Sequence, residues 1–110
     1  MAVTFTLEQW AGAVRYATPE GGRTADQIAR LTARFEMIKG MVESRAPDAP
    51  PAVQNGCTIL LGEFLAYPAG SNALGAGDYS PRYLAGAWYS SGCAAVTKQW
   101  AKRRATIPNA

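Results

Sequence analysis

Apolar residues recur at helical spacing along most of the chain, and stretches rich in proline and glycine interrupt them. The longest nearly uncharged run, residues 51–67, carries apolar side chains on most sides, with Glu63 as its only ionised group. Pro51 suits the first helical position, whose N–H has no acceptor within the helix, and Pro68 ends the run. Because a helix this apolar needs cover on several sides, we expect residues 51–67 to form a central, buried helix.

Three positions inside this run carry specific expectations. Leu60 lies in the middle of the apolar stripe and is expected in the core. Gly56 and Gly62 lower the helix propensity, and we expect them to let neighbouring backbones approach the central helix closely.

Two further helices are predicted to begin at capping boxes, in which Ser or Thr is followed three residues later by Glu or Gln. Thr6 with Gln9 opens a helix over residues 7–16, and Thr24 with Gln27 opens one over residues 25–44. In the second, apolar residues alternate spacings of three and four, which indicates an amphipathic helix: Ile28, Leu31, Phe35, Ile38 and Val42. Its charged residues are expected on the opposite, exposed face: Arg30, Arg34, Glu36, Lys39 and Glu43.

Ser80 and Pro81 have the form of an N-cap followed by proline at the first helical position. They predict a last helical region over residues 81–103, which Ser90, Ser91 and Gly92 are expected to kink or divide. Residues 68–80 hold three glycines and little to pack, so this loop is expected to be mobile or held by a partner.

With 110 residues, of which 48% are hydrophobic and 17% charged, the chain is long and apolar enough to fold around one core. We therefore predict a single all-α domain over residues 1–110, built as a small bundle of about four helices. Its core is expected within residues 6–90, with an extended basic segment over 91–110. No signal peptide and no bilayer-spanning run are apparent in the sequence, which favours a cytoplasmic product.

The net charge of +3 is unevenly distributed. Residues 1–78 hold six basic and eight acidic groups, whereas residues 79–110 hold five basic groups and no acidic one. These cations could complement the negative end of a helix dipole, or they could form a docking segment for an acidic surface. When only the charges are considered, the first interpretation is favoured. Trp100, close to Lys102, Arg103 and Arg104, has the composition of an interface anchor. The alternative for this segment is a terminal helix folded onto its own subunit.

The residues offer little for catalysis. The chain has no histidine, which is the usual general base and metal ligand, and its eight carboxylates show no paired spacing. Cys57 has no activating base in evidence, and with Cys93 it is expected to form a reduced, buried pair that matters only for packing. We therefore predict no enzymatic activity, no cofactor and no metal. A small helix-turn-helix DNA-binding protein is the alternative function, although no predicted turn is short enough for that motif.

Three short motifs follow one another along the chain in an order that is similar to that of a known family. They are Thr6-Leu7-Glu8-Gln9 with Val14-Arg15; Ala49-Pro50-Pro51-Ala52-Val53-Gln54-Asn55 running into Ile59–Tyr67; and Ser91-Gly92-Cys93-Ala94-Ala95 followed by Trp100 and Arg103-Arg104. This order resembles the head–tail connector proteins, also called adaptor or head-completion proteins, of long-tailed phages and gene-transfer agents.

The resemblance implies a virion protein, made in the host cytoplasm, that forms a ring below the portal at the head–tail junction. The ring, a dodecamer by the portal's symmetry, would extend the channel through which DNA passes without sequence-specific binding. The implied partners are the portal, a stopper or tail-terminator protein and further copies of the chain, with no membrane. The implied portal contacts are Ser91, Gly92, Trp100, Lys102, Arg103 and Arg104. The implied subunit contacts are Met37, Met41, Leu74 and Tyr79, although the methionines could instead fill gaps in the core.

Overall fold

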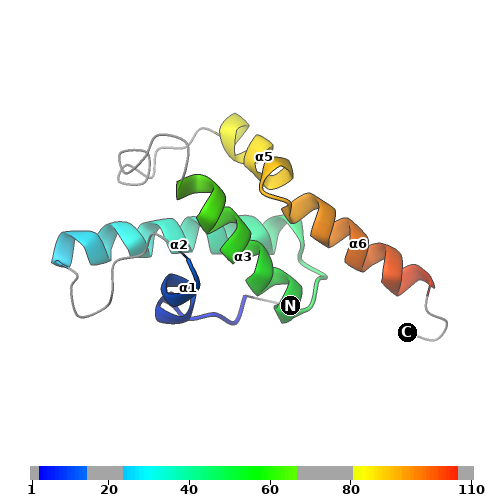
Figure 1. Cartoon of the computed structure of the whole chain (residues 1–110), viewed down its shortest axis with the longest axis horizontal. Helices are drawn as coiled ribbons and strands as arrows, with labels where there is room; N and C mark the ends of the chain where they lie inside the picture. Colours follow the sequence, from blue (N-terminus) through cyan, green and yellow to red (C-terminus); the bar gives the residue numbers. More distant parts are fainter. Residues whose placement is uncertain (1–2, 15–23, 67–80, 107–110) are drawn as a thin grey trace.

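A computed structural model of the chain describes residues 3–14, 24–66 and 81–106, and helices make up most of these ranges (Figure 1). They are α1 (Leu7–Ala13), α2 (Ala25–Arg45), α3 (Pro51–Ala66), α5 (Pro81–Ser90) and α6 (Cys93–Thr106). No strand occurs within the described ranges, which confirms the all-α prediction. The last predicted helical region divides at Ser91 and Gly92, so the four predicted helices correspond to five among the described residues. Leu74 and Tyr79 lie outside the described residues.

Both predicted capping boxes are present. The Thr6 hydroxyl accepts a hydrogen bond from the Gln9 N–H at 3.1 Å, and the Gln9 side chain accepts one from the Thr6 N–H at 2.9 Å. Thr24 and Gln27 repeat the arrangement at the start of α2 with the same two distances. Because these bonds satisfy N–H groups that have no partner inside the helix, each box fixes the residue at which its helix begins.

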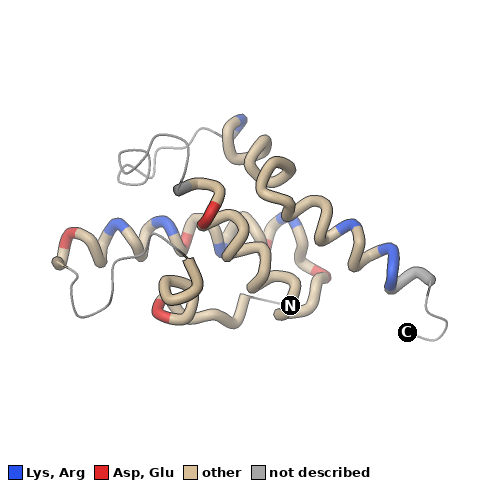
Figure 2. Tube along the Cα trace, viewed as in Figure 1, with Lys and Arg blue, Asp and Glu red and all other residues tan. Residues whose placement is uncertain are grey.

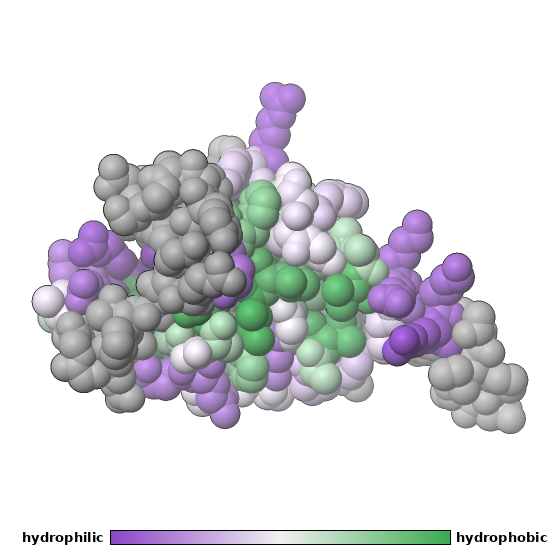
Figure 3. Space-filling view, viewed as in Figure 1, coloured by the Kyte–Doolittle hydropathy of each residue, from purple (hydrophilic) through white to green (hydrophobic). Residues whose placement is uncertain are grey.

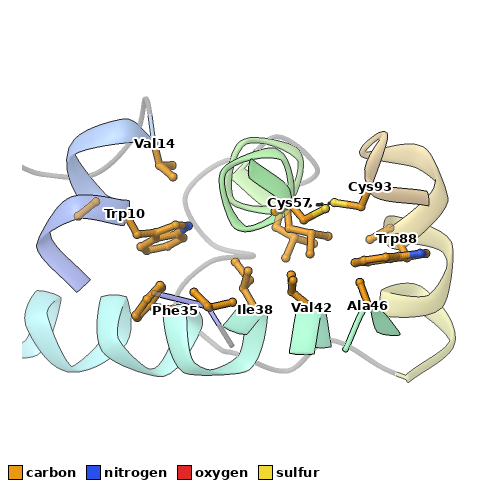
Figure 4. Packing of buried hydrophobic residues seen from close by; sticks show 14 of the residues in the cluster. Trp10, Val14, Phe35, Ile38, Val42, Ala46, Cys57, Trp88 and Cys93 are labelled. Carbon is orange, nitrogen blue, oxygen red and sulfur yellow. Dashed lines mark hydrogen bonds between the residues drawn. The ribbon is translucent and has the colours of Figure 1, made fainter. Parts of the chain in front are cut away.

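Helix α3 is the centre of the molecule and contacts every other described helix. It crosses α2, with α1 against one flank and the α5–α6 pair against the other (Figure 1). A single cluster of buried side chains joins these helices (Figure 4). Cys57, Leu61 and Leu65 are the fully buried apolar residues of α3, whereas Leu60 is only half-buried and packs against the cluster. The predicted central helix is confirmed, with Leu61 rather than Leu60 at the middle of the core.

A buried polar contact closes the hairpin between α2 and α3. Gln54 is fully buried, and its side-chain amide donates to the Ala46 carbonyl at 2.7 Å. Ala46 itself caps α2, because its N–H donates to the Val42 carbonyl at 2.8 Å. The proline-rich connection over residues 46–50 is thereby held at both sides, since Ala49 is also fully buried.

Side chains of α2 and α3 bind the backbone of the segment that precedes α1. The side-chain amide oxygen of Asn55 accepts hydrogen bonds from the N–H groups of Thr4 and Phe5, at 3.0 and 3.2 Å. The Glu43 carboxylate accepts one from the Val3 N–H at 3.0 Å. Val3 is buried in the cluster, as is Cys93 at the other end of the chain. The core therefore reaches beyond the predicted range of 6–90 at both ends.

Arg34 differs from its prediction. The charge pattern of α2 predicted it on the exposed face, but the residue is only 9% exposed. Arg34 lies beside Leu31, Phe35 and Ile38 at helical spacing, so it borders the apolar stripe. The long aliphatic part of an arginine side chain can be buried against such a stripe.

The two glycines of α3 differ in their surroundings. A Cβ atom at Gly62 would lie 2.8 Å from a methyl carbon of Val14 and 3.0 Å from the Trp10 ring, so side chains of α1 occupy the space a larger residue would need. A Cβ atom at Gly56 would have no such neighbour within 4 Å. The expected close approach is therefore found at Gly62, where side chains and not backbone atoms make it, and the expectation is wrong for Gly56.

These surroundings predict opposite effects of alanine on stability. Gly56→Ala is expected to raise the free energy of unfolding by up to about 1 kcal/mol, because alanine favours the helix. Gly62→Ala is expected to lower it by about 1–3 kcal/mol, because overpacking against Val14 and Trp10 exceeds that gain. Urea titration of both variants measures the difference, and Val14→Ala added to Gly62→Ala should recover part of the loss. Equal effects of the two substitutions would contradict the packing of α1 on Gly62.

Candidate protein-interaction surface on the C-terminal helix

The corner between α5 and α6 consists of Ser91 and Gly92. Gly92 has a φ of 94°, a left-handed conformation that favours glycine. Its N–H donates to the Tyr89 carbonyl at 3.1 Å, and its own carbonyl accepts from the Val96 N–H at 3.0 Å. Gly92 thus ends α5 and begins α6, and the Ser91 hydroxyl accepts from the Cys93 N–H at 3.4 Å.

Helix α5 is held on the body of the protein by Trp88. This residue is 6% exposed and belongs to the buried cluster together with its neighbour Ala87. The guanidinium carbon of Arg45, at the end of α2, lies 6.0 Å from the centroid of the Trp88 ring, at the outer limit of a cation–π contact. Trp88 therefore attaches α5, and with it the corner that sets the direction of α6, to the body of the protein.

Helix α6 is buried where it begins and largely exposed over residues 98–103. Cys93 is fully buried, and Thr97, one turn later, is half-buried. From residue 98 to residue 103 every residue is exposed except Trp100, which is half-buried and packs against the cluster. In Figure 1 the distal half of α6 extends beyond the other helices.

The exposed part of α6 is basic. We define the basic face as Lys98, Lys102 and Arg103, whose side chains are all exposed. Residues 81–106 contain no Asp or Glu, whereas the acidic residues of the described chain lie on α1, α2, α3 and the α2–α3 connection (Figure 2). Figure 3 shows the hydrophilic side chains of this end standing clear of the apolar surface over the centre of the molecule. Cations near a helix C-terminus also favour the helix itself, so the basic face serves α6 whether or not a partner binds.

The residues implied as portal contacts do not form one patch. Ser91 and Gly92 lie half-buried at the corner, and Lys102 follows Gly92 by ten residues, roughly 15 Å along the helix axis. Trp100 lies between them and packs toward the protein's own core. The Arg104 side chain lies outside the described residues. The structure therefore separates a corner with a conformational role from the basic face.

Of the implied subunit contacts, Met37 and Met41 are half-buried and pack against the cluster. That position agrees with the alternative in which the methionines fill gaps in the core. Sequence reasoning did not single out Tyr89, which is 71% exposed on α5. Its only signal is that it follows Trp88 directly and so falls off the apolar stripe of the helix.

The two cysteines, 36 positions apart, meet between α3 and α6 (Figure 4). Both are free and fully buried, and the Cys93 thiol donates to the Cys57 carbonyl at 3.4 Å. Contact with the Cys93 side chain lowers the pKa of the Cys57 thiol, against the opposing effect of burial, and Thr97 lowers it further. The same contact and burial raise the pKa of the Cys93 thiol.

Within the ranges that the structure describes, no three Cys, Asp or Glu side chains lie together as a set that could hold a metal ion. None of the described helices is both long and apolar enough to cross a membrane. Compared with models of protein families, with curated proteins and with solved structures, the chain has no match.

Proposed function

We propose that this chain is a structural virion protein, a head–tail connector that assembles as a ring below the portal. In this role it links head to tail and extends the DNA channel. Its portal-binding element is the basic face of α6, assisted by Arg104. The observation that carries the proposal is the position of this face: it lies on a helix that extends beyond the body and carries no acidic residue.

The three segments that carry the resemblance have distinct positions in the fold. The first contains the capping box of α1, the second contains the α2–α3 connection and α3, and the third runs from the corner into α6. Gln54 and Asn55, in the second segment, bind backbone groups of Ala46, Thr4 and Phe5. These two residues hold segments of the chain's own fold together, so the proposal assigns them no partner.

The body of the protein can support an exposed binding helix. Cys93 and Trp88 anchor α5 and the start of α6 in the core, so the distal half of α6 keeps a fixed direction. Guanidinium and ammonium groups on such a helix suit the carboxylates of an acidic partner surface. A ring needs two different neighbour-facing patches on each subunit. The half-buried Met37 and Met41 remain candidates for one of them.

The test is capture of the purified full-length chain on purified portal protein. Substituting Lys102, Arg103 and Arg104 by alanine together is expected to weaken capture at least about tenfold, since each exposed charge contact contributes a modest amount and three are lost. The melting temperature should stay close to the parental value because the described members of this set are exposed. The matched control removes three basic residues elsewhere, Arg30, Lys39 and Arg82, and should leave capture unchanged.

Trp100→Ala is a separate arm of this test because Trp100 packs against the core. It is expected to lower the melting temperature, and its effect on capture is read only under conditions in which the variant is folded. Undiminished capture by the Lys102, Arg103 and Arg104 variant would contradict the assignment of the basic face. Failure of the parental chain to bind portal at all would contradict the connector function.

A DNA-binding function is the second candidate, and one observation favours it. The corner between α5 and α6 has only two residues and is a short turn that the sequence did not predict, and α6 exposes Lys98 and Gln99. Against it, α6 continues in the general direction of α5 in Figure 1, whereas a recognition helix crosses the helix before it. Duplex binding that falls steeply as salt rises, and that the Lys102, Arg103 and Arg104 variant loses, would favour this candidate over the connector.

A further inference from the structure

We propose that Cys57 and Cys93 form an oxidisable dithiol site, which a small hydroperoxide closes into a disulfide between α3 and α6. This role goes beyond the packing role that the sequence predicts for the pair.

The geometry brings the two thiols together. Both side chains are fully buried, and Figure 4 shows them pointing toward one another across the α3–α6 contact. The Cys93 sulfur lies 3.4 Å from the Cys57 carbonyl oxygen, to which its thiol donates a hydrogen bond. A disulfide requires the two cysteine side chains to face each other at short range, and the packing of α6 on α3 places them in that orientation (Figure 4).

The surroundings give the two sulfurs different roles. The Cys57 sulfur lies 3.9 Å from the Thr97 hydroxyl and close to the Cys93 side chain, and both neighbours lower the pKa of Cys57, which favours its thiolate. The pKa of Cys93 is raised, so Cys57 is the thiol of the pair that more readily loses its proton. Cys57 is therefore the attacking sulfur, since the thiolate is the nucleophile, and Cys93 is the resolving thiol.

The reaction balances with hydrogen peroxide as oxidant. The Cys57 thiolate attacks one peroxide oxygen, the O–O bond breaks, and hydroxide leaves, which gives a sulfenic acid at Cys57. The Cys93 sulfur then attacks the sulfenic sulfur, an S–S bond forms, and the displaced hydroxyl leaves as water with the Cys93 proton. Two thiols and one hydrogen peroxide thus give one disulfide and two waters, and the two electrons lost by the sulfurs reduce the O–O bond.

The disulfide would fix the start of α6, and with it the direction of the basic face, to the central helix. Cross-linking residues 57 and 93 also reduces the conformational freedom of the unfolded chain, which stabilises the folded state. If the proposed function holds, the chain folds in a reducing cytoplasm and is cross-linked after the particle reaches an oxidising medium. The chemistry itself does not depend on that function.

The experiment treats the reduced, purified full-length chain with hydrogen peroxide and follows it by intact mass and non-reducing peptide mapping. The expected product is a monomer that has lost two hydrogen atoms and contains the Cys57–Cys93 cross-link. Its melting temperature should rise by at least about 5 °C, and dithiothreitol should reverse the rise. Because both sulfurs are buried, a bulky thiol reagent should react with the folded chain far more slowly than with the unfolded chain.

Two variants test the separate roles. Cys93→Ser removes the resolving thiol, so peroxide should leave a sulfenic acid at Cys57 that dimedone traps when the chain is then unfolded. Cys57→Ser removes the attacking sulfur, so Cys93 should stay unmodified under the same conditions. The proposal is overturned if the folded parental chain gives only over-oxidised cysteines, only disulfide-linked dimers or no product. It is also overturned if the cross-linked monomer has the same melting temperature as the reduced chain. No portal is present in this assay, so its outcome is independent of the capture experiment.

Discussion

Leu61→Asp is expected to abolish the cooperative thermal unfolding of this protein. Leu61 is fully buried at the middle of α3, and the central helix contacts every other described helix. An aspartate at this site would have to be buried as an unpaired charge or neutralised, and it would leave unfilled part of the space that leucine occupies. We expect a loss of more than about 4 kcal/mol, a large part of the stability of a domain this size. Circular dichroism during heating measures it.

Leu60→Asp is the matched control, one position along the same helix. Leu60 is half-buried, so a carboxylate there can turn toward water. We expect this variant to fold, with a loss of about 1–2 kcal/mol in urea titration. If Leu61→Asp melted like the parent, or if Leu60→Asp were the more damaging change, the orientation of α3 would be wrong.

Trp10→Ala is expected to destabilise the protein by about 3–5 kcal/mol, the usual cost of removing a large buried aromatic side chain. Trp10 is fully buried, its ring centroid lies 5.3 Å from that of Phe35 on α2, and its indole N–H donates to the Thr58 carbonyl of α3 at 2.9 Å. One side chain therefore joins three helices. Urea denaturation gives the free energy of unfolding.

Trp10→Phe separates packing from the hydrogen bond. Phenylalanine keeps an aromatic ring against Phe35 but has no N–H for the Thr58 carbonyl, so a loss of about 1–3 kcal/mol is expected. If alanine and phenylalanine at this position had the same effect, the contact with Phe35 and the α3 backbone would contribute little. The position of α1 would then depend on other residues.

The sequence predicted the local features of the fold well because local interactions determine them. The capping boxes at Thr6 and Thr24 depend on residues three apart, and both are present in the structure. Pro51 begins α3, as expected of a proline in the first turn. The division of the last helical region was left open because Gly92 acts through its left-handed backbone conformation, which a glycine permits but does not require.

Contacts between distant segments could not be predicted. Gln54 is a buried polar residue whose side chain donates a hydrogen bond to the Ala46 carbonyl. Nothing in its sequence spacing distinguishes it from a solvent-facing glutamine. Arg34 is buried beside an apolar stripe, whereas its charge alone predicts a position on the opposite, exposed face. Cys57 and Cys93 meet only because α6 packs on α3. Periodicity identifies the apolar face of each helix, but it does not say which other helix covers that face.

The candidate site was predicted from the distribution of charge along the sequence, without knowledge of how α6 is oriented. The uneven distribution of charge identified the basic segment, and Lys98, Lys102 and Arg103 of this segment are exposed in the structure. Grouping Ser91, Gly92 and Trp100 with these cations came from the resemblance alone. In the structure the first two form the corner, and Trp100 packs toward the core. These roles require the direction of α6, which no local pattern gives.

The hairpin between α2 and α3 also bears on the order in which the chain folds. The hydrogen bond from Gln54 to Ala46 spans eight residues, whereas the bonds from Thr4 to Asn55 and from Cys93 to Cys57 span 51 and 36. Closing a short loop costs less chain entropy than closing a long one, and local contacts are associated with faster folding. The α2–α3 hairpin is therefore expected to form early and to serve as the surface on which α1 and the α5–α6 pair later assemble.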